Sequence, residues 1–200
     1  MGSDPLHVCH GPCQGARGSV KEVAQVDVAP GRGADLPCDG MVLRLEPFVE
    51  AHARTVLGWV ESAEEADRWA SAGSRVLEPA LLREWHADPE VRPYVGFEGS
   101  EPVGYGEVWE DRDADEAELA RILVAPALRR RGIGRRLTAL LGERARESGF
   151  ADVWLRVVPD NEPALAAYRA AGFVRTSPEE EASFNDGQPC AYVWMKLSDR

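Results

Sequence analysis

The sequence has no long hydrophobic run. No apolar segment approaches the roughly 20 residues that a membrane-spanning helix needs. The first 40 residues also lack the apolar stretch that a secretory signal requires. We therefore expect no membrane partner, and the cytoplasm is the simplest location to expect.

Cysteine and positive charge are both scarce. The 200 residues include four scattered cysteines, which do not require an oxidising compartment. Acidic residues number 34 against 23 Lys and Arg, which gives a formal net charge of −11. An acidic chain with one small basic patch is poorly suited to the nucleic-acid backbone, so we expect no nucleic-acid partner.

The first 40 residues differ in composition from the rest. Residues 1–40 are rich in glycine and proline and show little periodic apolar pattern, which predicts a disordered leader. Four potential metal ligands in this segment match no standard zinc spacing, and we expect no metal site. They are His7, Cys9, His10 and Cys13.

Residues 41–200 have the length and patterning of one domain with a single core. We expect strands at 42–46, 92–98, 102–110, 116–124, 151–158, 173–176 and 191–197. Helical patterns fall at 49–60, 63–71, 79–87 and 135–146, and a further helix begins at 161. Strands 116–124 and 151–158 are joined through a helix, so they should be parallel neighbours in a mixed α/β sheet.

An Arg- and Gly-rich loop precedes the helix at 135–146. Gly132 and Gly134 stand where this helix begins, and five arginines fall among residues 129–136. Free backbone N–H groups and the helix dipole favour an anion there, and glycine lets the backbone approach a phosphate closely. The alternative is a glycine-containing turn that enters a solvated basic helix.

Two familiar phosphate loops are excluded by residue type. Gly134 is followed by Arg135 and Arg136, whereas a Walker loop needs Lys and then Ser or Thr. Position 137 is Leu, whereas a dinucleotide fingerprint has a third glycine. The loop is therefore interpreted as a phosphate cradle without metal chemistry.

With its neighbours, this loop resembles the acyl-CoA loop of the GNAT superfamily of N-acetyltransferases, written Q/R-x-x-G-x-G/A. The resemblance runs from Met41 to Leu197, is strongest over 118–173 and is closest to the RimI-like branch. Further matching features are the strand end at 122–126, Asn161, Tyr168 and the Ala-Gly-Phe sequence at 171–173. It implies a GNAT-type mixed central sheet flanked by helices, in which splayed parallel strands form the acyl-CoA cleft.

The resemblance also implies acetyl-CoA as co-substrate. Backbone groups of Ile122, Leu123 and Val124 would meet its pantetheine arm, and an N–H near Val124 would polarise the thioester carbonyl. Asn161 and Tyr168 would flank the far end of the cofactor. The pyrophosphate would be bound by the loop residues Arg129, Arg130, Arg131, Gly132, Ile133, Gly134 and Arg135.

Two side chains are candidates for proton transfer. Free amines have pKa values of about 8 to 10.4 and attack a thioester only when neutral, so a base is useful. Glu118 lies 14 positions before Gly132, the spacing at which the histone-acetylating branch carries its base. The alternative for Glu118 is a strand carboxylate on a solvated face. Tyr168 could protonate the departing CoA thiolate, or it could be a core aromatic beside Phe173.

We therefore expect an N-acetyltransferase that acts on a primary amine of a small molecule or protein in a ternary complex. A catalytically silent acyl-CoA sensor and a protein-interaction domain remain alternatives, and a homodimer is left open. Acidic residues in expected loops at 107–118 and 179–181 could steer a cationic amine, although solvated loops are the simpler interpretation. Trp59, Trp69 and Trp85 are expected to fill the core.

Overall fold

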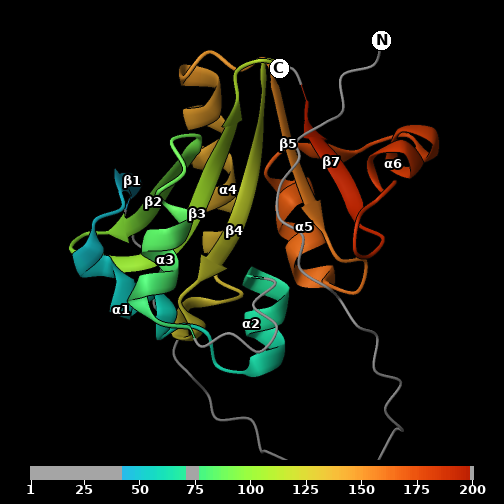
Figure 1. Ribbon diagram of the computed structural model, residues 1–200. Helices are drawn as coiled ribbons and strands as arrows, with labels where there is room; N and C mark the ends of the chain where they lie inside the picture. Colours follow the sequence, from blue (N-terminus) through green and yellow to red (C-terminus); the bar gives the residue numbers. More distant parts are fainter. Residues whose placement is uncertain (1–41, 71–76, 199–200) are drawn as a thin grey trace, which may run out of the picture.

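Seven strands form one mixed sheet in the computed structural model, which describes residues 42–70 and 77–198 (Figure 1). The sheet order is β1-β2-β3-β4-β5-β7-β6, and only β4 and β5 are parallel neighbours. The strands are β1 (Leu43–Pro47), β2 (Val91–Glu98), β3 (Glu101–Asp111), β4 (Glu116–Val124), β5 (Asp152–Val157), β6 (Phe173–Arg175) and β7 (Val193–Leu197). The expected leader, 1–40, lies outside the described residues, as do its His and Cys side chains.

Helices cover both faces of this sheet. They are α1 (Ala53–Leu57), α2 (Ala63–Ala70), α3 (Pro79–Trp85), α4 (Ile133–Glu147), α5 (Glu162–Ala170) and α6 (Pro178–Phe184), with 3-10 turns η1 (Glu50–His52) and η2 (Pro126–Leu128). The predicted mixed α/β sheet is confirmed. The helix predicted over 49–60 is shorter, because a 3-10 turn opens it and α1 ends before Gly58.

Helix α6 corrects the prediction of an acidic loop around 179–181. Ser177 caps the helix by accepting a hydrogen bond from the Glu180 N–H at 3.2 Å, and the Glu180 carboxylate accepts one from the Ser177 N–H at 3.1 Å. Pro178 occupies the first turn, where its missing N–H costs nothing. The sequence S-P-E-E is thus a capping box followed by a helix rather than a solvated loop.

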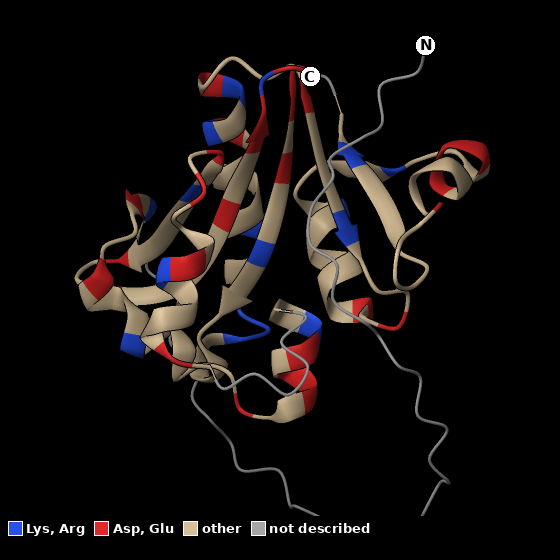
Figure 2. Cartoon of the chain, in the orientation of Figure 1, with Lys and Arg blue, Asp and Glu red and all other residues tan. Residues whose placement is uncertain are grey.

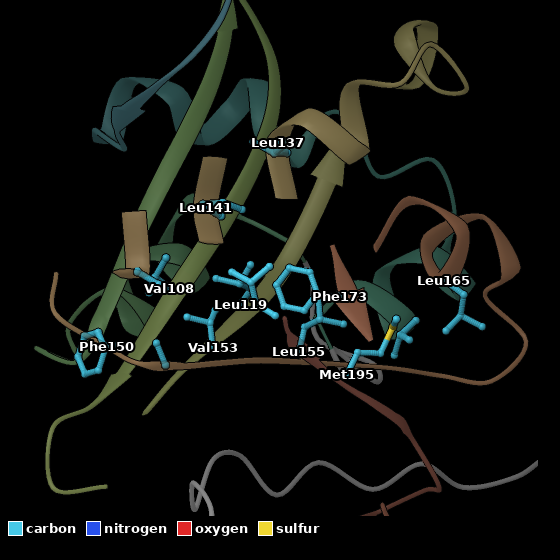
Figure 3. Packing of buried hydrophobic residues seen from close by; sticks show 14 of the residues in the cluster. Val108, Leu119, Leu137, Leu141, Phe150, Val153, Leu155, Leu165, Phe173 and Met195 are labelled. Atoms are coloured by element: carbon cyan, nitrogen blue, oxygen red, sulfur yellow. The ribbon is translucent and has the colours of Figure 1, made fainter. Parts of the chain in front are cut away.

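One core lies between the sheet and helices α4 and α5. Leu137 and Leu141 of α4 pack with side chains from the strands, including Val108 and Leu119 (Figure 3). Two glycines of β3 allow this close approach. A Cβ at Gly104 would lie 2.7 Å from Leu137 Cδ2, and one at Gly106 would lie 2.5 Å from Leu141 Cδ1. The glycines therefore seat α4 against the sheet.

A second core lies on the opposite face, under α1, α2 and α3. Trp59, Trp69 and Trp85 all belong to it, as expected, and they pack with Tyr105 of β3 and Leu123 of β4. Strand residues alternate between the two cores because successive side chains point to opposite faces. This second face carries the polar residues described below.

The parallel strands β4 and β5 separate soon after they meet. They pair only over Glu116–Glu118 and Asp152–Trp154, and beyond that point they diverge (Figure 1). From residue 119 to 124, β4 is paired with β3 alone. The predicted splay is confirmed, and it leaves one backbone edge of β4 without a strand partner.

Within the ranges that the structure describes, no helix is both long enough and apolar enough to cross a membrane. Over the same ranges, no three His, Cys, Asp or Glu residues are grouped so that they could hold a metal ion. The cytoplasmic location and the homodimer stay predictions.

Candidate acyl-CoA site

The loop between β4 and α4 places an uncapped helix N-terminus beside the open edge of β4. Gly132 is the N-cap of α4, has φ +77° and provides no capping side chain. Arg130 also has a left-handed backbone, with φ +63°. The N–H groups of the first turn therefore have no side-chain acceptor, and the helix dipole adds positive potential. This geometry suits an anion.

The glycines leave this helix end open. A Cβ at Gly132 would meet nothing within 4 Å, so the positive φ is the constraint at this position. A Cβ at Gly134 would lie 3.7 Å from Val124 Cγ2 and 3.8 Å from Ala167 Cβ, which are ordinary contacts. Protein packing therefore does not require glycine at position 134, whereas close approach of a ligand would favour it.

Two of the five loop arginines are held by carboxylates. Arg129 pairs with Glu65 at 2.6 Å and Glu61 at 3.2 Å and also donates to the carbonyls of Val124 and Trp59. Arg136 pairs with Glu98. The remaining three are exposed, and no described residue pairs with them: Arg130, Arg131 and Arg135. Figure 2 shows the basic loop beside the acidic residues of α2. Contact between Arg129 and pyrophosphate stays a prediction, whereas its observed contacts anchor the loop to α2.

Asn161 and Tyr168 both belong to α5: Asn161 lies at its start and Tyr168 within the helix. Asn161 is the N-cap, as expected, and its Oδ1 accepts from the Ala164 N–H at 3.3 Å. Tyr168 is half-buried against the α4 side of the core. Burial raises the pKa of the Tyr168 phenol to about 12, so the group keeps its proton at neutral pH. The cofactor contacts predicted for both residues stay predictions.

Glu118 occupies the last position at which β4 pairs with β5, opposite Trp154. The residue is 1% exposed, which excludes the solvated-face alternative. Its Oε1 lies 3.2 Å from Arg156 Nε, and its Oε2 is buried without a hydrogen-bond partner. Burial raises the pKa of Glu118, and the guanidinium groups of Arg156 and Arg121 offset only part of this effect. The strands thus separate at a buried carboxylate with one free oxygen.

A second buried carboxylate, Glu107 of β3, was not predicted as part of a site. Its Oε2 accepts hydrogen bonds from Arg121 Nη1 at 2.7 Å and Trp109 Nε1 at 2.6 Å, and its Oε1 accepts from the Tyr105 hydroxyl. His86 Nε2 lies 3.5 Å from Oε1. Burial acts to raise the pKa of Glu107, but these partners outweigh burial and the pKa is lowered. Glu107 is therefore an ionised, fully paired group.

The expected acidic loop at 107–118 is corrected in the same way. Most of the segment belongs to strands β3 and β4, and Glu107, Glu110 and Glu118 are buried. Glu110 pairs with Arg112 at 2.6 Å and Arg92 at 3.2 Å. Paired arginines take up the charges of the buried carboxylates, and only the exposed turn with Asp113 and Asp115 matches the expected solvated loop.

Residues 56–173 match the acetyltransferase (GNAT) family. The chain therefore belongs to the GNAT family of acetyltransferases. It is 37% identical to the streptothricin acetyltransferase of Streptomyces lavendulae over 112 residues, which is 54% of this chain and 59% of that protein. It is 41% identical to the ribosomal protein alanine N-acetyltransferase of Escherichia coli over 59 residues, 30% of this chain and 40% of that protein. This last match bears out the resemblance to the RimI-like branch.

Solved structures confirm the fold. An aminoglycoside acetyltransferase in complex with coenzyme A superposes with a TM-score of 0.62 at 20% identity, covering 78% of this chain and 95% of that one. The chain spans about half the length of the first curated relatives that it matches, 45% and 59%.

Proposed function

We propose that this chain is an N-acetyltransferase that moves an acetyl group from acetyl-CoA to a primary amine. The observation that supports this most strongly is the continuity of the open β4 edge with the uncapped N-terminus of α4. An extended pantetheine arm can bond to the free strand edge as an added strand would, and the pyrophosphate then meets the helix end. The exposed arginines Arg130, Arg131 and Arg135 supply the countercharge.

The proposed chemistry is a direct transfer in a ternary complex. The amine nitrogen attacks the thioester carbonyl carbon, and the new N–C bond gives a tetrahedral intermediate whose collapse breaks the C–S bond. Glu118 Oε2 accepts the proton that the amine loses. The Tyr168 phenol donates a proton to the departing CoA thiolate and is later reprotonated from solvent. Backbone N–H groups near Val124 stabilise the developing oxyanion.

Glu118 suits the role of base because of its environment. A carboxylate with a raised pKa is a better proton acceptor than a solvated one, and burial raises the pKa of Glu118. The free Oε2 is a lone acceptor in a buried site, so an amine there completes an unsatisfied hydrogen bond. Both properties depend on burial rather than on contact with a metal.

Gly132→Asp tests the cofactor assignment. The built Cβ meets no protein atom, so we expect a folded variant, whereas the new carboxylate lies at the helix end that would hold pyrophosphate. We expect coenzyme A affinity, measured by calorimetry, to fall at least about tenfold below that of Gly132→Asn. Gly132→Asn has the same size and backbone strain without the charge. Equal coenzyme A affinities in the two variants would show that the pyrophosphate does not bind at this loop.

Tyr168→Phe tests the proton donor. The hydroxyl is the only group that this change removes, and the ring keeps its packing against the core. We expect kcat to fall roughly hundredfold in a thiol-release assay, while calorimetric binding of coenzyme A stays within about twofold. An unchanged kcat would make Tyr168 a packing residue.

A further inference from the structure

One arginine contacts Glu118 where β4 and β5 separate, and a second acts on its charge. Arg156 of β5 places Nε 3.2 Å from Glu118 Oε1, and Arg121 of β4 is close enough to lower the pKa of the same carboxyl. Both guanidinium groups are nearly enclosed, since the side chains of Arg121 and Arg156 are 9% and 13% exposed. Glu118 is thus a buried acceptor that is paired with Arg156, and the charge of Arg121, which is held by Glu107, also acts on it.

Aromatic rings and polar contacts fix both guanidinium groups. Arg121 Cζ lies 3.8 Å from the ring centroid of Trp85 and 4.9 Å from that of Trp109, and Arg121 Nη1 is bound by Glu107. Arg156 Cζ lies 5.3 Å from the centroids of Tyr192 and Trp194, and its Nη1 contacts Gln188 Oε1 at 3.4 Å. Stacked, nearly enclosed guanidinium groups lose little further freedom when they bind a ligand.

These contacts leave complementary groups unused. Glu118 Oε2 is a buried acceptor without a donor. No described residue accepts a hydrogen bond from Nη2 of Arg121 or Nη2 of Arg156. A ligand that satisfies this site must donate to a carboxylate and accept from a guanidinium at the same place.

The charge of the site also selects among amines. Glu107 and Glu118 balance Arg121 and Arg156, so the buried cluster is neutral. A polyamine would bring further positive charge toward two guanidinium groups, and like charges close together in a buried site repel one another. The acidic residues that could have compensated are already paired, as with Glu110 between Arg92 and Arg112. A zwitterion fits such a site better than a polycation does.

We propose that the acceptor is a primary amine with a carboxylate close to the reacting nitrogen, as in an α-amino acid. Its amine lies on Glu118 Oε2, and Arg156 binds its carboxylate, with Arg121 adding charge from the opposite strand. Arg156 is then the residue that determines specificity. This inference rests on the proposed acetyltransferase function and adds the substrate class to it.

Matched acceptors test the proposal on the full chain. Each amino acid is compared with its carboxamide and its decarboxylated amine in a thiol-release assay with acetyl-CoA, so that the side chain is constant. We expect kcat/KM to be about 10- to 100-fold higher for the acid than for the amide, which is the range of a charge-assisted hydrogen bond. Arg156→Gln should abolish this preference by raising KM for the acid alone. Arg112→Gln is the control, because Arg112 pairs with Glu110 in the β3–β4 hairpin.

The ratio of kcat/KM for the amino acid to kcat/KM for its carboxamide separates carboxylate recognition by Arg156 from the effect of Arg156 on the pKa of Glu118. Removing this guanidinium also raises the pKa of Glu118, which moves the acid limb of the pH profile to higher pH for every acceptor alike. Equal or better turnover of amides and polyamines would overturn the inference and leave the acetyltransferase standing. A preference that survives in Arg156→Gln would also overturn it, as would calorimetry in which no amino acid binds the CoA-loaded protein. If the unaltered chain did not bind coenzyme A, the proposed function itself would be contradicted.

Discussion

Glu118→Gln is expected to lower kcat by about 10²- to 10⁴-fold, the range for removal of a general base. Gln keeps the size of the side chain and one oxygen that can still face Arg156, so we expect the fold to persist. It removes the proton acceptor at Oε2, which is buried and has no other partner. Coenzyme A affinity should change little, because the predicted phosphate contacts lie at the other end of β4.

The pH profile of kcat/KM provides the decisive measurement. The base works only when ionised, so kcat/KM should rise with pH through the pKa of Glu118, which burial raises. This acid limb should disappear in Glu118→Gln. Glu116→Gln is a matched control, since Glu116 lies two positions earlier on β4 and also has a raised pKa, caused mainly by burial. If Glu118→Gln kept the acid limb of the pH profile and the full kcat, as Glu116→Gln is expected to do, the base would have to be another group.

The fold and the loop could be predicted because their signals are local. Helical periodicity, glycines at the helix start and a strand on each side define the segment from β4 to α5, and the splay followed from the family resemblance. The ion-pair partners of the loop arginines could not be predicted in this way. Arg129 is held by Glu61 and Glu65, and Arg136 by Glu98, residues that lie far earlier in the chain.

The buried polar residues show where sequence reasoning stops. Glu118 was a candidate only through family resemblance, because a carboxylate between Ala117 and Leu119 suits a half-solvated strand equally well. Its burial depends on the packing of distant elements over that face. Arg121 was assigned no role in a site, and Glu107 was considered only as part of the acidic segment at 107–118, although each interrupts an apolar strand pattern. Charged residues inside two adjacent strands are a signal for a buried ion pair, but only the register of β3 and β4 shows that they meet.

Glu107→Ala is expected to destabilise the protein by about 3–5 kcal/mol, the usual cost of removing one partner from a buried ion pair. Arg121 would keep its charge in a nearly enclosed site, and Tyr105, Trp109 and His86 would each lose an acceptor. Urea denaturation measures the change. Replacing both Glu107 and Arg121 by Leu should cost less than Glu107→Ala alone, because no charge is then left unpaired. A single variant as stable as the unaltered protein would contradict this assignment.

The pH dependence of stability should also reflect the buried ion pair of Glu107. Because the pKa of Glu107 is lower in the folded protein than its ordinary value, its stabilising contribution is complete above the unfolded pKa, about 4.3. The contribution is lost as pH falls from there through the lower, folded pKa. Glu107→Gln cannot titrate, so its free energy of unfolding should fall less steeply with acid than that of the unaltered protein. Parallel slopes would show that Glu107 is not held ionised. A smaller slope would show that Glu107 is ionised in the folded protein, as its ion pair with Arg121 requires.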